Sequence, residues 1–262
     1  MTLVLIAALA YIIATGALVA TLRRGSRPAT WPWMAPALFA ITLHTTAHAV
    51  MWRGAAGADL HFFATLSLVG LGMAALTTIV GAAGRMAALG VVVFPIAALV
   101  ALAYGRIGAS TAQALDWRVQ LHAWSALLAY ATLAVAALLA LMSWVQERAL
   151  RRHQLRAWMR ALPPLVELET LTFRTIAVGF ALLTAALLTG VLFVEDLLSQ
   201  RLLHKTVLSA LSWLTFGALL LGRWRRGWRG EIALRWTLAA MGLLILAFFG
   251  SKFVIELVLQ RA

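Results

Sequence analysis

The sequence predicts an all-α fold, a polytopic integral membrane bundle of about eight transmembrane helices. Of the 262 residues, 63% are apolar and only 12% are charged, and the mean hydropathy is +0.91. Soluble domains are about 45–50% apolar and about 25% charged. The composition therefore excludes a soluble globular enzyme and a disordered chain. Because the sequence contains no cysteine, a disulfide scaffold and a thiolate metal site are excluded as well.

Each predicted helix corresponds to one long apolar run. A hydrocarbon core about 30 Å thick needs about 20 apolar residues per helix. Such runs occupy 3–21, 33–52, 61–82, 87–104, 119–147, 171–194, 205–222 and 233–258. The fourth run contains Pro95, which we expect to kink it. The fifth is longer than a straight span needs, so we expect it to tilt or to project from the bilayer. Together they predict a single transmembrane domain, 1–262.

The distribution of basic residues predicts how these helices are oriented. The first, third, fifth and seventh connections, with the adjoining helix ends, carry 15 Lys or Arg residues, against five in the second, fourth and sixth. Cytoplasmic loops are the ones enriched in Lys and Arg. We therefore expect both termini outside. The net charge of +13 is then mainly a signal of sidedness, and we expect no nucleic-acid partner.

The fifth connection has the densest positive charge. Residues 148–160 (RALRRHQLRAWMR) precede the pair Pro163-Pro164. We expect this stretch to form a basic interfacial helix that the prolines end, and to lie against anionic lipid.

Five of the six histidines are predicted to lie near the outer face. His44 and His48 fall in the outer half of the second helix, and His61, His122 and His204 each begin a helix on that side. Ionisable residues inside a membrane are costly and usually face a bundle interior or a cavity. Convergence at one depth predicts that at least two of them serve a common site.

The surroundings of two of these histidines favour haem. His122 and His204 begin separate helices next to apolar and aromatic residues, which suits the two axial positions of a non-covalent, b-type haem. Arg118 and Lys205 are placed to pair with haem propionates, and His44 and His61 are further candidates for the site.

A divalent-metal site is the alternative interpretation. His44 and His48 are four residues apart and share a helix face, and His61 could complete such a site in a metal permease subunit. The sequence has no nucleotide-binding glycine loop and no Ser/His/Asp arrangement. We therefore expect a binding, transport or assembly protein and not an enzyme.

Several stretches resemble the cytochrome c assembly protein family, the CcsA/CcmC-type haem-handling membrane proteins. The sequence is most similar to the YpjD/HemX-like inner-membrane branch. The matching stretches are 59–69 (DLHFFATLSLV), 120–132 (QLHAWSALLAYAT), 162–171 (LPPLVELETL), 204–213 (HKTVLSALSW), 227–230 (GWRG) and 249–254 (FGSKFV). Each is weak alone, but their order along eight helices is specific.

The resemblance implies a multi-pass protein of the bacterial inner membrane that holds or passes haem at the outer, periplasmic face, with apocytochrome c or other assembly proteins as partners. His122 matches the family's outer-face histidine at the start of a helix, and His44 matches a histidine of the YpjD-like branch. His204 and Lys205 fall where better-known members end their tryptophan-rich haem loop.

The sequence also departs from the family pattern. The tryptophan-rich WGxxWxWD-type run is absent from 194–205, and the second outer histidine that should follow it is missing from 219–223. These departures argue against a haem ligase and leave haem binding, with His204 substituting as a ligand. Because HemX-like relatives are linked to the control of haem biosynthesis, a membrane regulator is a further alternative.

Overall fold

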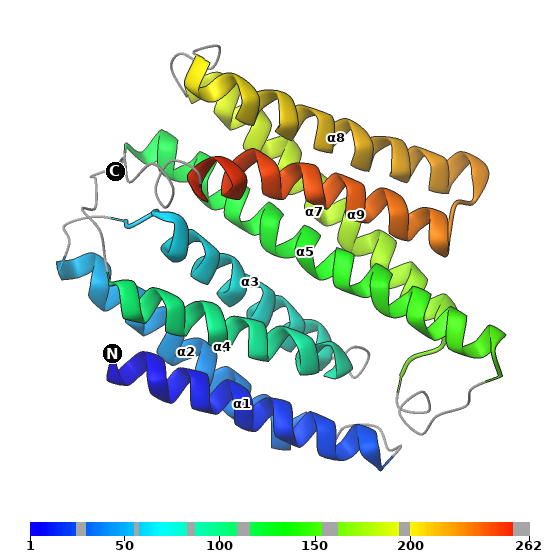
Figure 1. Cartoon of the computed structure of the whole chain (residues 1–262), viewed down its shortest axis with the longest axis horizontal. Helices are drawn as coiled ribbons and strands as arrows, with labels where there is room; N and C mark the ends of the chain where they lie inside the picture. The colour runs from blue at the N-terminus through cyan, green and yellow to red at the C-terminus, as the bar shows by residue number, and fades with distance from the viewer. Residues whose placement is uncertain are drawn as a thin grey trace. The chain divides into compact units, whose positions relative to one another are not determined.

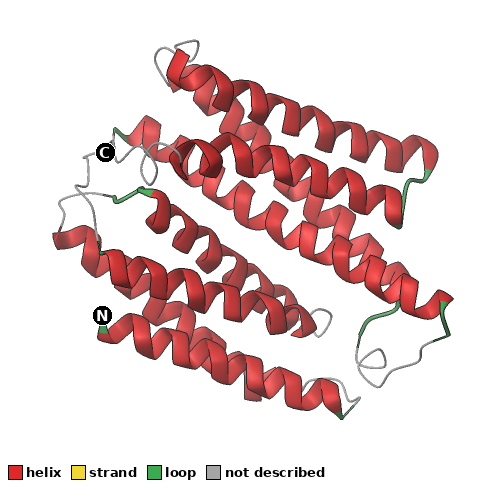
Figure 2. Cartoon of the chain, viewed as in Figure 1, coloured by secondary structure: helices red, strands yellow, loops and turns green. Residues whose placement is uncertain are grey.

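The computed structural model is all-α, as predicted, and contains no β-strand in the part of the chain that it describes (Figure 2). The described residues are 1–24, 30–54, 58–82, 87–108, 116–153, 162–193 and 200–253. The helices, labelled in Figure 1, are α1 (Thr2–Arg23), α2 (Thr30–Gly54), α3 (Phe62–Ala82), η1 (Ala87–Leu89), α4 (Gly90–Ile107), α5 (Trp117–Arg151), α7 (Leu165–Phe193), α8 (Gln200–Arg226), α9 (Glu231–Ile245) and the π-helical turn η2 (Leu246–Gly250).

Eight helices within the described residues are long and apolar enough to cross a membrane, and they coincide with the eight predicted runs. At 35 residues, α5 exceeds a simple span, as its apolar run predicted. The first residues of the basic stretch 148–160 continue α5 to Arg151 and do not begin a separate interfacial helix. The remainder, from residue 154, lies outside the described residues, as do the outermost part of the last predicted run and the loop 194–199.

The contacts between helices group the chain into two compact units. Unit 1 comprises Met1–Ala114 with Gln146–Glu167, and unit 2 comprises Leu115–Val145 with Leu168–Ala262.

Unit 1 is built around α1–α4. In it α1 packs against α2 and α4, and α3 packs against the same two helices (Figure 1). Tyr11 and Trp33 both stack on Phe94, and all three side chains are buried. At Gly70 of α3, an added Cβ would lie 2.5 Å from a methyl carbon of Val100, so this position requires glycine for α3 and α4 to approach this closely.

Unit 2 is built from α5, α7, α8, α9 and η2. An added Cβ at Gly179 of α7 would lie 2.6 Å from the side chain of Leu133 on α5, which shows how closely these two helices pack. The buried Ser212 hydroxyl of α8 donates to the carbonyl of Ala240 on α9. The Tyr130 hydroxyl of α5 donates to the carbonyl of Leu244 in the last turn of α9. These side-chain hydrogen bonds tie the helices together without exposing polar groups to lipid.

Candidate functional site

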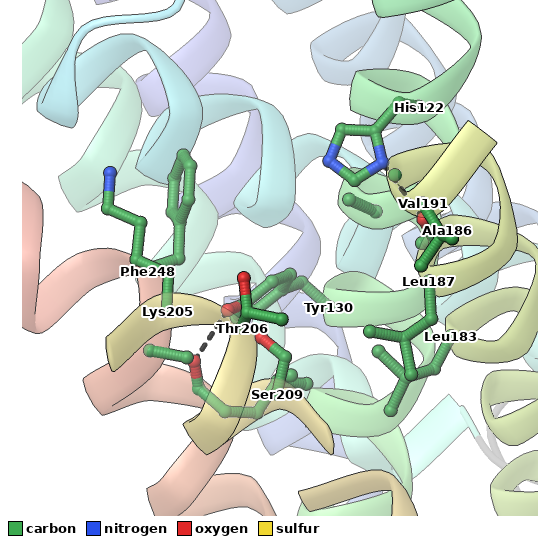
Figure 3. A pocket seen from close by; sticks show the side chains of 14 residues that line it. His122, Tyr130, Leu183, Ala186, Leu187, Val191, Lys205, Thr206, Ser209 and Phe248 are labelled. Carbon is green, nitrogen blue, oxygen red and sulfur yellow. Dashed lines mark hydrogen bonds between the residues drawn. The ribbon is translucent and has the colours of Figure 1, made fainter. Parts of the chain in front are cut away.

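Unit 2 contains a largely apolar cavity of about 320 Å³ (Figure 3). It lies among α5, α7, α8, α9 and η2 and is lined by His122, Ala126, Tyr130, Leu183, Ala186, Leu187, Gly190, Val191, Lys205, Thr206, Ser209, Leu244, Ala247 and Phe248. Binding pockets for small molecules and cofactors usually have volumes of about 300–1,000 Å³ and combine apolar walls with a few polar groups. The cavity fits this description.

His122 is held in a defined orientation by α7. Its Nδ1 lies 2.9 Å from the carbonyl oxygen of Ala186, with the Thr189 hydroxyl at 3.5 Å. A carbonyl only accepts hydrogen bonds, so Nδ1 carries the hydrogen and donates. In the neutral ring this leaves the lone pair on Nε2. A histidine that binds a metal commonly donates its other ring N–H to a carbonyl or carboxylate in this way.

The backbone of α7 leaves room for this ring. An added Cβ at Gly190 would lie 3.1 Å from Cε1 and 3.3 Å from Nδ1 of His122. Glycine therefore allows the imidazole to lie against the helix while it bonds to Ala186, one turn earlier.

Polar groups from α8 line another part of the cavity. Lys205 contributes an ammonium group, and Thr206 and Ser209 contribute hydroxyls (Figure 3). The remaining walls are mostly aliphatic side chains and the ring of Phe248. An imidazole nitrogen suits the haem iron, a cation suits a propionate and an apolar lining suits the macrocycle, so the residues present fit this cofactor.

Of the four unit 2 residues predicted for the site, only His122 and Lys205 line the cavity. His204 is exposed and is not among the lining residues. Arg118 is exposed too, and its guanidinium lies over the rings of Trp117 and Phe193, at 5.7 and 5.9 Å from the ring centroids.

The other predicted residues form a polar cluster within unit 1. His44 and His48 are buried on α2, and the Nε2 of each lies within hydrogen-bond distance of the Ser67 hydroxyl on α3, at 2.8 and 3.0 Å. On its other side, Nδ1 of His44 lies 3.4 Å from the hydroxyl of Tyr11 on α1. The Tyr104 ring of α4 stacks on His48, with centroids 4.5 Å apart.

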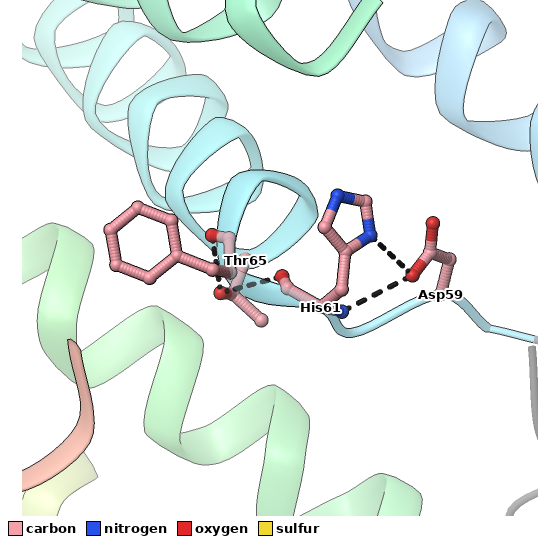
Figure 4. Close-up of polar contacts among 4 residues, drawn as sticks. Asp59, His61 and Thr65 are labelled. Carbon is pink, nitrogen blue, oxygen red and sulfur yellow. Dashed lines mark hydrogen bonds and ion pairs between the residues drawn. The ribbon is translucent and has the colours of Figure 1, made fainter. Parts of the chain in front are cut away.

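His61 lies at the start of α3 in the same cluster (Figure 4). Its Nδ1 lies 2.7 Å from the carboxylate of Asp59, whose side chain is completely buried, and its backbone N–H donates to the same oxygen. Its ring also packs against Tyr104. The Nε2 of His61 and the Nδ1 of His48 are buried without a hydrogen-bond partner in the described structure.

Within the described residues, no group of three or more His, Cys, Asp or Glu side chains is placed to hold a metal ion. The alternative three-histidine metal site, from His44, His48 and His61, stays a prediction.

Sequence reasoning missed Ser67 and Tyr104 in unit 1 and Thr206 and Ser209 in unit 2. The last two had a usable signal, because residues 205, 206 and 209 recur at helical spacing beside the predicted His204. Nothing local marks Ser67, because its role depends on two side chains of another helix.

Comparison with known proteins gives a family match over most of the chain. The model of the family described as "Cytochrome C assembly protein" matches residues 30–259. No solved structure matches the chain.

Curated relatives match shorter segments. The chain is 36% identical over 138 residues to "Inner membrane protein YpjD" of Escherichia coli (strain K12), and the alignment covers 52% of each chain. It is 39% identical over 143 residues to "Uncharacterized 28.8 kDa protein in nifR3-like 5'region" of Azospirillum brasilense, covering 54% of this chain and 53% of the relative. It is 31% identical over 90 residues to "Cytochrome c biogenesis protein CcsA" of Prochlorococcus marinus (strain MIT 9515), covering 34% and 29%. The chain thus spans about half the length of the first two relatives.

Proposed function

Because the chain belongs to the cytochrome c assembly protein family, we propose that it holds haem non-covalently in the unit 2 cavity, as a binder or conduit and not as a ligase. The observation that carries this proposal is His122. Its Nδ1 is fixed by the Ala186 carbonyl, which leaves the Nε2 lone pair on the imidazole of a largely apolar cavity.

Each part of the cavity has a role in this proposal. His122 would hold the iron, and the Lys205 ammonium would pair with a propionate. The apolar side chains, including Leu183, Leu187 and Phe248, would contact the apolar part of the cofactor and exclude water. Bound haem supplies a redox-active, Lewis-acidic iron. His204 as second axial ligand, and Arg118, His44 and His61 as haem contacts, stay predictions.

The names of the relatives support the proposed location and partners. The Escherichia coli relative is named an inner membrane protein, which supports the predicted multi-pass location in the bacterial inner membrane. The Prochlorococcus relative is named for cytochrome c biogenesis, which supports apocytochrome c or another assembly protein as the recipient of haem. The predicted orientation, with the arginine-rich connections cytoplasmic, would put both termini and the recipient on the outer side.

The experiment is a haem titration of the detergent-purified protein, followed through the Soret band. We expect saturable binding near one haem per chain. Replacing His122 by Ala should weaken it at least about 10-fold, because even second-shell changes at a metal site cost 10–100-fold. His153→Asn is the matched control, since His153 is exposed and has a positive φ of 55° that Asn tolerates. A wild-type protein that takes up no haem contradicts the proposal.

Control of haem biosynthesis by a membrane regulator is an alternative. It uses the same cavity and differs in the partner, which would bind the arginine-rich stretch 148–160. Reversing the charge of these residues should abolish capture of a soluble partner and leave haem binding intact if regulation is the function. Unchanged capture contradicts regulation.

A further inference from the structure

Tyr130 is buried and lines the unit 2 cavity, but the groups proposed for the iron and the propionate do not include it. It lies two turns after His122 on α5, with Ala126 between them, and residues at this spacing share one helix face. The Tyr130 ring contacts the ring of Phe248, another lining residue, with the ring centroids 6.0 Å apart (Figure 3). Tyr130 therefore belongs to the same cavity wall as His122 and also contacts the aromatic side chain that η2 contributes.

The backbone that carries Phe248 departs from a regular α-helix. The helix α9 ends at Ile245, and Leu246–Gly250 form the π-helical turn η2. A π-turn joins residue i to i+5 where an α-helix joins i to i+4, so it holds one more residue. Such turns are rare, and they often occur at functional sites. Because the α-helix is the usual form, the π-helical form of η2 needs support from its surroundings.

Hydroxyl groups support η2 at both ends. The Tyr130 hydroxyl donates to the carbonyl of Leu244, in the last turn of α9. The Ser251 hydroxyl donates to the carbonyls of Ala247 and Phe248, at 3.2 and 2.9 Å. Side chains that bond to the backbone allow irregular turns within membrane helices. Of these three bonds, the one from Tyr130 comes from another helix, so it ties the turn to α5.

Aromatic packing fixes the same turn against α5. The buried ring of Phe249 lies edge to face with the Tyr130 ring, with centroids 5.5 Å apart, and with the Phe248 ring, with centroids 5.2 Å apart. The three rings contact one another in pairs, so movement of one displaces the others. If η2 relaxed to an α-helix, its residues would turn relative to α9 by up to about 100°, the angle of one residue, and Phe248 would leave its place in the cavity wall.

We propose that Tyr130 is a positioning residue of the haem site, because its hydroxyl and ring hold η2 in the form that keeps Phe248 in the cavity wall. This inference rests on the proposed function. The Tyr130 hydroxyl is engaged by the Leu244 carbonyl, so it acts on bound haem through η2 and not directly. Phe248 supplies a flat aromatic surface that suits a macrocycle, since aromatic rings attract one another in offset-stacked or edge-to-face arrangements.

The test measures the haem affinity of the detergent-purified, full-length protein by titration, and the midpoint of thermal unfolding of the same protein without haem. Tyr130→Phe removes the hydroxyl and keeps the ring. We expect it to weaken haem binding by about 10-fold, within the range of about 2- to 100-fold that coupling between contacting residues produces. Its Soret maximum should shift in the same direction as that of Phe248→Leu, which removes the ring from the cavity wall.

Ser212→Ala is the matched control. The buried Ser212 hydroxyl also donates from another helix to a carbonyl of α9, that of Ala240, and Ser212 does not line the cavity. Both variants should lower the midpoint of thermal unfolding of the haem-free protein, because each leaves a buried carbonyl with one hydrogen bond fewer. Only Tyr130→Phe should weaken haem binding, which separates positioning from a general loss of stability.

A double-mutant cycle shows whether Tyr130 acts through Phe248. The double variant, Tyr130→Phe with Phe248→Leu, should bind haem no more weakly than the weaker-binding single variant, because both changes disturb one contact surface. Independent effects that multiply overturn the inference, as does wild-type affinity in either single variant or an equal loss of affinity in Ser212→Ala; each of these results leaves the proposed function standing. A wild-type protein that takes up no haem overturns both.

Discussion

Replacing Gly190 by Ala tests the haem site without touching a ligand. The new Cβ would lie 3.1 Å from Cε1 of His122, while carbon atoms in contact prefer about 3.5–4.0 Å. The ring must therefore move by about 0.4 Å or more. Its hydrogen bond to Ala186, now 2.9 Å, is at the preferred length and will be lengthened or bent by that movement.

The expected loss of haem affinity is about 10–100-fold, the usual effect of disturbing a group that orients a metal ligand. This corresponds to about 1.4–2.8 kcal/mol of binding free energy. The free energy of unfolding of the haem-free protein should change by less than about 1 kcal/mol, because the helix propensity gained with Ala offsets the close contact.

The assay pairs a haem titration with thermal unfolding of the haem-free protein in detergent. Gly242→Ala is the matched control, because nothing lies within 4 Å of its added Cβ. This control should keep wild-type haem affinity. Equal affinity of the Gly190→Ala and wild-type proteins, with haem bound by both, would refute the placement of His122 as the oriented ligand.

Three further predictions concern packing and topology. Ser67→Ala leaves two buried imidazole nitrogens without their partner, so the midpoint of thermal unfolding should fall, by an amount equivalent to about 1–3 kcal/mol; an unchanged midpoint contradicts the shared hydroxyl. Gly179→Ala places a Cβ 2.6 Å from a leucine of α5 and should destabilise by about 1–3 kcal/mol, whereas Gly242→Ala should not. Because the chain has no cysteine, Arg106→Cys should react with an impermeant maleimide in intact cells and Arg225→Cys only after permeabilisation; the reverse pattern refutes the predicted orientation.

The membrane spans could be predicted from the sequence because a long apolar run in lipid must form its backbone hydrogen bonds within itself. An α-helix does this. The same reasoning found the extra length of α5. His122 and Lys205, which line the cavity, were named from the sequence because one is a histidine at the start of an apolar helix and the other adjoins such a histidine.

The parts of the site that escaped prediction depend on the helix face and on backbone atoms. The sequence does not show which face of α8 points to the cavity. It therefore could not predict that Lys205 lines the cavity while its neighbour His204 is exposed. The Ala186 carbonyl that orients His122 belongs to a residue with no polar side chain. Ser67, whose hydroxyl lies within hydrogen-bond distance of both α2 histidines, is an ordinary small residue of an apolar helix.

The Ser67 hydroxyl, which His44 and His48 share, constrains which ring nitrogen of each histidine carries the hydrogen. Ser67 has one hydrogen, so for neutral rings it donates to one Nε2 and must accept from the other. The two imidazoles are therefore opposite tautomers, and Tyr11 either donates to Nδ1 of His44 or accepts from it. The hydrogen bonds from α1 through α3 to His48 can therefore point only all one way or all the other.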